Sequence, residues 1–103
     1  MPKNNKKKDK YQVYVMTWHK HYTSNDEDCT WSEVYRSKKA AEAAMRKEME
    51  SHLDALGAYE DGEDVEKIIA DAFEAGDEME THNAWLDYGD CNAAFDIFPC
   101  DII

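Results

Sequence analysis

Residues 11–22 read YQVYVMTWHKHY, an uninterrupted run rich in β-branched and aromatic side chains. Such residues occupy both the odd and the even positions, so both faces of an extended chain would carry apolar groups. We therefore expect a long β-strand over 11–22. The polar stretch 23–28 interrupts the pattern, and strand-forming residues return over 29–36. Two such runs around a polar segment predict a hairpin with a solvent-exposed loop.

Two helical patterns follow this hairpin. Residues 38–56 carry an apolar residue every three or four positions, with Ser37 placed to cap the first turn and Gly57 to end the helix. Residues 65–75 repeat this spacing more closely, and here Asp64 is the expected cap and Gly76 the expected stop. The opposite face of this second, shorter helix is acidic.

The remaining residues contain two further strand-like runs, 79–88 and 91–98, separated by Gly89 and Asp90. Gly-Asp between alternating runs is a good signal for a two-residue hairpin turn. Pro99 cannot donate a backbone hydrogen bond, so we expect it to end or bend the last strand at an edge of the sheet. The predicted fold is therefore α+β in the order ββααββ, with a four-stranded antiparallel sheet and two helices packed on one face.

Charge is distributed very unevenly along the 103 residues, which carry a net charge of −11. Residues 48–103 contain seventeen acidic residues and a single base, Lys67. Residues 1–10 are instead basic, and we expect them to form a disordered tail before a single domain over 11–103. The lysines of this tail are Lys3, Lys6, Lys7, Lys8 and Lys10. Self-repulsion of this kind costs stability, so the acidic excess needs a function that offsets this cost. That function is either solubility alone or recognition of a partner.

A functional interpretation of the acidity has to name a partner. An acidic surface repels nucleic acid but is attracted to the basic groove of a protein built to hold nucleic acid. We therefore expect the acidic half to bind a basic, nucleic-acid-binding protein and to make no direct contact with nucleic acid. The expected partner-binding residues are Glu60, Asp61, Glu63, Asp64, Glu66, Asp71, Glu74, Asp77, Glu78 and Glu80.

A second candidate surface comes from the aromatic residues of the predicted sheet. Two helices can cover only one of its faces, and a large exposed apolar area usually marks an interface. Tyr14, Trp18 and Trp31 are therefore candidates to contact a partner or a second copy of the chain. Alternatively, these rings simply line a wet sheet surface.

The sequence contains no motif typical of an enzyme or a cofactor-binding protein. Its four glycines are scattered, which excludes a glycine-rich phosphate-binding loop. His19 and His21 share one face of the first strand, and with Cys29 and His82 they suggest a zinc site on paper. Alternating histidines on a strand are more often ordinary surface residues. We expect no catalytic residue, no metal and no cofactor.

Three cysteines, Cys29, Cys91 and Cys100, form no CxxC pair. An odd number of cysteines does not fit a secreted disulfide framework and favours a reducing compartment, where free thiols are commonly buried. A nucleophilic pair of Cys91 or Cys100 with His82 lacks any local sign of an activated thiolate. No apolar run is long enough for a signal peptide or a membrane span, so we expect a cytoplasmic protein that does not associate with membranes.

In its layout the chain resembles the small acidic inhibitor proteins of phages and other mobile elements, of the anti-CRISPR and anti-restriction type. The features that match are the Lys-rich start, the hairpin from YQVYVMTWHKHY to CTWSEVYRS, the helix KKAAEAAMRKEMESHLDAL and the acidic second half. The resemblance covers the whole chain, is architectural and assigns no individual functional residue. It implies a non-enzymatic inhibitor that presents its acidic surface in the manner of a nucleic-acid mimic.

Two other functions fit the same sequence. One is a self-associating structural module, a homodimer for example, in which the free sheet face pairs with a second copy and the acidic helices serve only solubility. The other is a small nucleic-acid binder that uses the Lys-rich tail together with sheet aromatics such as Trp18 and Trp31 for stacking.

Overall fold

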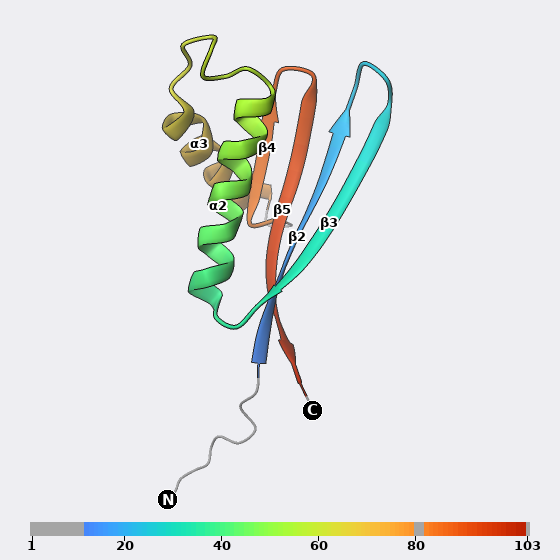
Figure 1. The fold of residues 1–103 in the computed structure, drawn as a ribbon, viewed down its shortest axis with the longest axis vertical. Coiled ribbons are helices and arrows are strands. Elements are labelled where there is room, and N and C mark those ends of the chain that lie inside the picture. The colour runs from blue at the N-terminus through green and yellow to red at the C-terminus, as the bar shows by residue number, and fades with distance from the viewer. Residues whose placement is uncertain (1–11, 80–81, 103) are drawn as a thin grey trace, which may run out of the picture.

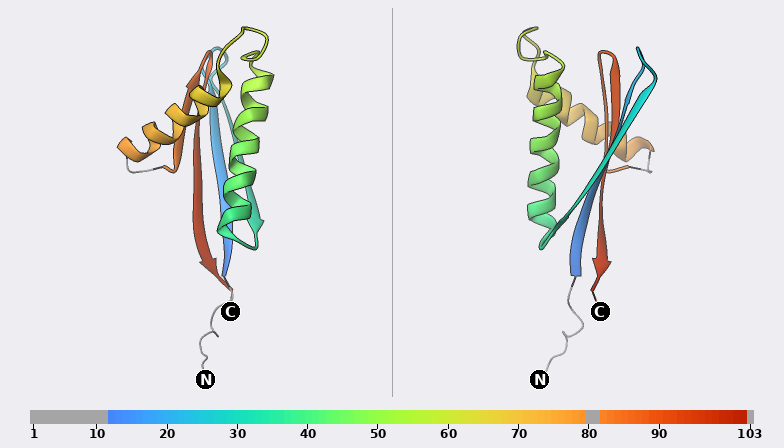
Figure 2. Two further views of the ribbon diagram at one scale, coloured as in Figure 1. Left: turned by 90° about the vertical axis from the view of Figure 1, so that its left-hand side faces the viewer. Right: turned by 45° about the vertical axis from the view of Figure 1, so that its right-hand side comes forward.

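A computed structural model describes residues 12–79 and 82–102 of the chain (Figure 1). Its elements are β2 (Gln12–Tyr22), β3 (Glu27–Tyr35), α2 (Lys38–Ala55), α3 (Val65–Met79), β4 (Ala84–Tyr88) and β5 (Cys91–Asp101). The strands form one antiparallel sheet in the order β3-β2-β5-β4, and both helices pack on one face of it (Figures 1 and 2). The predicted α+β fold, with the order ββααββ, is confirmed. The basic tail 1–10 and Glu80 lie outside the described residues.

The sheet is built around the pairing of its first and last strands. β2 and β5 run antiparallel over eleven residues, from Gln12 opposite Asp101 to Tyr22 opposite Cys91. Each of them then carries a hairpin partner on its outer side, β3 beside β2 and β4 beside β5. The turn between β4 and β5 consists of Gly89 and Asp90, as predicted, with Gly89 at a φ of 57°.

The alternation of side chains gives the sheet two different faces. Even-numbered residues of β2 point toward the helices, where Met16 is 3% and Lys20 is 7% exposed. Odd-numbered residues of β2 lie on the opposite side, which we call the open face. Through the strand register, the open face also includes Asp28, Thr30, Ser32 and Val34 of β3, Asn92, Ala94, Asp96 and Phe98 of β5, and Trp85 and Asp87 of β4.

The core lies between the helices and the opposing sheet face. α2 contributes its predicted apolar stripe, including Met45, Met49 and Leu53, and α3 contributes Ile69, all at most 1% exposed. They pack with Phe95, the largest fully buried side chain. Each of these residues gains roughly 1.5–3 kcal/mol from leaving water, which is what holds the two amphipathic helices on the sheet.

Both predicted helix caps are present. The Ser37 side chain accepts a hydrogen bond from the amide of Ala40 at 3.1 Å, and Asp64 accepts one from the amide of Lys67 at 3.2 Å. Gly57 follows α2 with a φ of 85°, a left-handed conformation that favours glycine and ends the helix as predicted.

The prediction that Gly76 ends the second helix is wrong, because α3 continues to Met79 and β4 begins only at Ala84. Gly76 is buried inside the helix, and a Cβ atom there would lie 2.7 Å from the backbone nitrogen of Ala84 and from the carbonyl carbon of Asn83. Glycine is therefore required at this position by the close approach of the chain that enters β4.

Of the two effects expected of Pro99, ending or bending the last strand at an edge, the first is wrong, since β5 runs through it to Asp101. The amide of Ile97 points away from β2 and donates to Oδ1 of Asn83 at 2.8 Å. Two residues further on, the Pro99 nitrogen faces the same side, where β4 no longer pairs with β5. The missing amide hydrogen therefore costs no bond of the sheet.

Replacing Gly76 with alanine should destabilise the protein by about 1–3 kcal/mol, because the added methyl group would overlap backbone atoms. Alanine is intrinsically the better helix former by about 1 kcal/mol, so helix propensity alone predicts the opposite sign. Urea unfolding monitored by circular dichroism measures the difference. Glu74→Ala, on the exposed side of the same helix, serves as the control and should stay within about 0.5 kcal/mol of the wild type.

His52 is a buried polar residue of α2, only 4% exposed. Its Nε2 atom has no hydrogen-bond partner among the described residues. Burial, and to a smaller extent the positive charge of Lys20, lowers the pKa of His52 to about 4. The folded protein therefore holds this imidazole in its neutral form, whereas the unfolded chain takes up the proton near pH 6.5.

This difference predicts that His52 makes the fold sensitive to acid. As the pH falls from about 6.5 to about 4, the unfolded chain binds the proton and the folded protein does not, so stability is lost over that window. From pH 7 to pH 5 the loss due to this group is about 2 kcal/mol. His52→Leu should remove that part of the pH dependence of the unfolding free energy. Equal pH dependence in the two proteins would contradict the assignment.

Candidate functional site

The acidic segment predicted to bind a partner forms the loop before α3 and the outer side of that helix. All nine of its described members are exposed, and we call them the acidic surface: Glu60, Asp61, Glu63, Asp64, Glu66, Asp71, Glu74, Asp77 and Glu78. Lys67 is the single base in this segment, and its Nζ atom lies 2.9 Å from Oδ2 of Asp71. Among the residues that the structure describes, no other base forms an ion pair with the acidic surface.

Basic side chains gather at the other end of the molecule. Arg36, Lys38, Lys39, Arg46 and Lys47 are all exposed, on the N-terminal half of α2 and the chain leading into it. In Figure 1 this part of α2 lies at the lower end of the helix layer, whereas the loop before α3 lies at its upper end. The loop of the acidic surface and these bases therefore lie at opposite ends of the helix layer, although α2 itself also carries acidic side chains such as Glu42.

The acidic surface is carried by anchored elements. The hydroxyl of Tyr88, on β4, donates a hydrogen bond to Asp61 in the loop at 3.2 Å. Partial burial and this bond to a carboxylate raise the pKa of Tyr88. Val65, the first residue of α3, is buried in the core. The loop and the helix therefore hold their carboxylates in a defined arrangement over β4.

Tyr14, Trp18 and Trp31, the second candidate surface, lie on the helix side of the sheet rather than on its open face. Tyr14 and Trp18 are half-buried against the core. Trp31 stacks on Trp18 with ring centroids 6.5 Å apart, and the Nζ of Lys20 lies 4.1 Å from the Trp18 ring centroid. Trp31 is 54% exposed, because β3 extends beyond the helices. Of the three residues, it is the one most accessible to a partner.

The open face contains a pocket of about 640 Å³ that sequence reasoning did not single out. Its centre is a row of paired residues across all four strands: Thr30, His19, Ala94 and Trp85. The small side chain of Ala94 lies between two large rings and leaves a hollow. The other lining residues are Thr17, Trp18, His21, Trp31, Ser32, His82, Asn92 and Asp96. Trp18 and Trp31 contribute backbone there, because their rings project to the other face.

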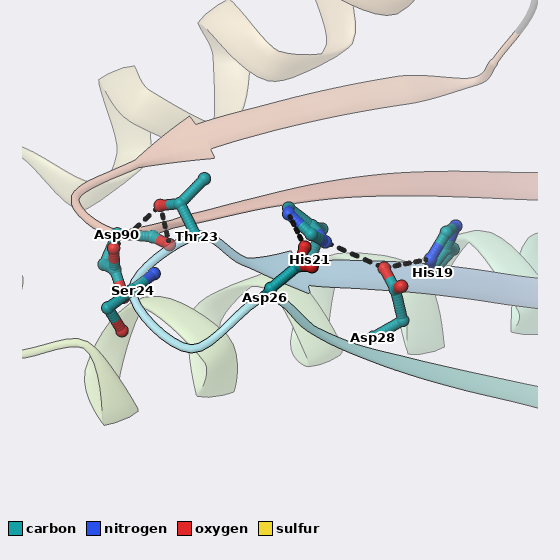
Figure 3. A network of polar contacts seen from close by, with 7 residues as sticks. All are labelled: His19, His21, Thr23, Ser24, Asp26, Asp28 and Asp90. Atoms are coloured by element: carbon teal, nitrogen blue, oxygen red, sulfur yellow. Dashed lines mark hydrogen bonds and ion pairs between the residues drawn. The ribbon is translucent and has the colours of Figure 1, made fainter.

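Histidine–aspartate pairs surround this pocket. Oδ1 of Asp28 lies 2.9 Å from both Nε2 of His19 and Nδ1 of His21 (Figure 3). The hydrogen bonds from His21 and His19 lower the pKa of Asp28. On the far side, Nδ1 of His82 lies 2.9 Å from Oδ2 of Asp96, and its ring stacks on Trp85 at a centroid distance of 6.0 Å.

The hairpin turns at one end of the sheet are joined by Asp90 (Figure 3). Oδ1 of Asp90 accepts a hydrogen bond from the hydroxyl of Thr23 at 2.7 Å, and Oδ2 accepts one from the amide of Ser24 at 3.2 Å. Hydrogen bonding by the side chains of Ser24 and Thr23, and to a smaller extent the bond from the Ser24 amide, lowers the pKa of Asp90. These hydrogen bonds of Asp90 connect the β2–β3 turn to the β4–β5 turn and so support the strands that line the pocket.

The structure separates Cys29 from the histidines of the zinc arrangement considered above. His19 and His21 lie on the open face, whereas Cys29 is opposite Lys20 and lies on the helix side. No group of three histidine, cysteine or acidic side chains within 12–79 and 82–102 is arranged to hold a metal ion.

The expectation that the thiols are buried holds only for Cys91, since Cys29 and Cys100 are exposed. Cys29 lies on β3, which the helices do not cover, and Cys100 lies near the end of β5, beyond β4. Burial raises the pKa of Cys91, which is the opposite of what an activated nucleophile needs.

The two imidazoles around Asp28 can be tested directly. Replacing both His19 and His21 with alanine should raise the pKa of Asp28 toward its ordinary value, because the hydrogen bonds to the carboxylate are lost. A ¹³C NMR titration of the carboxyl group in both proteins measures the change. An Asp28 titration that does not move would contradict the network in Figure 3.

Comparison with known proteins gives no relative from which a role can be transferred: no protein-family model, no curated protein and no solved structure matches the chain. Within the described part of the chain, no helix is long and apolar enough to cross a membrane. Function therefore has to be inferred from the acidic surface and the open-face pocket themselves.

Proposed function

We propose that the protein is a non-enzymatic inhibitor whose acidic surface binds the basic groove of a nucleic-acid-binding protein and competes there with nucleic acid. The observation that carries this proposal is the exposure of nine carboxylates on one loop and one helix, next to a single base that is already paired with Asp71. Coulomb attraction between a basic groove and such a surface stabilises the complex. The complementary electrostatic potentials of the two proteins also accelerate their association.

The length of α3 supports mimicry of a phosphate backbone. Glu66 and Glu78 are twelve residues apart on this helix, a rise of about 18 Å. One strand of DNA carries roughly five phosphates over the same distance. The carboxylates between these two ends, on Asp71, Glu74 and Asp77, provide a comparable row of negative charge.

The proposal places the protein in the cytoplasm, where nucleic-acid-binding enzymes work and where free thiols such as those of Cys29 and Cys100 stay reduced. It also agrees with the resemblance of the sequence layout to small inhibitors of the anti-CRISPR and anti-restriction type. The basic half of α2 lies away from the acidic surface, so it does not oppose the approach of a basic partner.

The test compares two variants of equal net charge. In the first, four carboxylates of α3 become amides: Glu66→Gln, Glu74→Gln, Asp77→Asn and Glu78→Gln. In the second, the same number is removed elsewhere on the surface: Glu27→Gln, Glu42→Gln, Glu50→Gln and Asp54→Asn. The tagged wild-type protein is first used to isolate the partner from cells at low salt. The partner is then bound to a fluorescent nucleic acid, and fluorescence anisotropy measures how well the wild type and each variant displace it.

We expect the wild-type protein to displace the nucleic acid, with an affinity that falls steeply as salt rises from 50 to 300 mM. The α3 variant should lose at least about tenfold in affinity, whereas the matched variant should lose less than about threefold. A partner that does not bind nucleic acid, a complex indifferent to salt, or equal losses in the two variants would each overturn the proposal.

A further inference from the structure

The open-face pocket borders the acidic surface. Trp85 lines it, and the same residue lines a smaller hollow of about 290 Å³ between α3 and β4. That hollow is also lined by Asp71, which belongs to the acidic surface, and by the exposed Asp87. A basic chain lying along α3 can therefore cross the edge strand β4 and reach the pocket past a line of carboxylates.

The charge of the pocket favours a cation. None of its lining residues is lysine or arginine, and its ionisable side chains are three histidines, His19, His21 and His82, and Asp96, whose carboxylate is 29% exposed. Asp96 receives one contact on each oxygen, from the amide of Asn83 at 3.2 Å and from Nδ1 of His82 at 2.9 Å. Each carboxylate oxygen has a second lone pair available for a ligand. An anion would face this carboxylate and the net charge of the whole chain.

The shape and hydrogen-bonding capacity of the pocket restrict the choice of cationic ligand further. The hydroxyl groups of Thr17, Thr30 and Ser32 and the side-chain amide of Asn92 all line the pocket. Trp85 provides an aromatic wall beside them. A guanidinium group is planar, carries five donors and stacks on aromatic rings, whereas an ammonium group is a compact, strongly hydrated point charge. The pocket offers acceptors beside an aromatic ring in a partly apolar hollow, which suits the guanidinium.

We propose that the open-face pocket receives an arginine side chain of the partner. This assignment rests on the proposed function, which supplies the basic partner. It adds that one residue of the partner is an arginine and that this arginine binds in the open-face pocket. Asp96 accepts from the guanidinium, Trp85 stacks on its plane, and the methyl group of Ala94 forms the floor beneath its edge.

Three small probes test this in the isolated protein: the N-acetyl amides of arginine, lysine and citrulline. Citrulline has nearly the shape of arginine and no charge. We expect the arginine probe to shift the backbone amide NMR signals of Thr30, Ala94 and Asp96, with a dissociation constant in the millimolar range. The lysine and citrulline probes should bind at least about tenfold more weakly, since they lack the planar fork or the charge.

Two variants locate the site. Ala94→Leu fills the floor and should abolish the shifts, and Asp96→Asn should weaken arginine binding about tenfold or more. Thermal unfolding of both variants verifies that they are folded. If one variant does not fold, the other alone is sufficient to locate the site. Equal binding of citrulline, shifts confined to α3, or no saturating shift with 50 mM arginine probe would overturn the assignment.

The α3 variant described above separates this inference from the proposed function. Its four altered residues do not line the pocket, so it should bind the arginine probe within about twofold of the wild type while it loses the partner. If the wild type displaces nucleic acid but ignores the arginine probe, only the pocket assignment fails. If the probe binds but displacement does not depend on α3, the acidic-surface mechanism fails instead.

Discussion

The pairing of β2 with β5 is the constraint on which the rest of the structure depends. It joins residues up to 89 positions apart, Gln12 and Asp101, and places β2 beside β5, the strand with the most buried residues. Both helices then lie on the face that contains Met16 and Phe95, because burial of those residues leaves no other site for the apolar stripes. The open face is what remains, and its pocket depends on the same register, which sets Ala94 opposite His19.

Local periodicity was sufficient to predict the elements and their order. The 3.6-residue stripes of both helices, the caps Ser37 and Asp64 and the Gly89–Asp90 turn all depend on neighbours within a few positions. Gly76 shows the limit of this reasoning. A glycine that ends a helix and a glycine that lets another chain approach are identical in sequence, and only the packing of α3 on residues 83–84 distinguishes them.

The candidate site was less predictable, because it depends on which face the helices cover. Apolar groups occupy both faces of 11–22, so the sequence alone did not decide where Trp18 and Trp31 would point. The acidic surface was visible in the sequence, since it lies within one continuous segment. The open-face pocket was not, because Thr30, His19, Ala94 and Trp85 come from four strands and meet only through their register.

The exposure of β3 has a consequence for the behaviour of the protein in concentrated solution. Eight of its nine residues are exposed, and it is an edge strand, so its free backbone groups form a template on which another chain can extend the sheet. Glu27, Asp28 and Glu33 place negative charge along this strand, and the net charge of the molecule keeps copies apart at neutral pH. Near the isoelectric point of about 4.6 that repulsion vanishes, and we expect the exposed edge of β3 to be the place where fibrous or amorphous assembly starts.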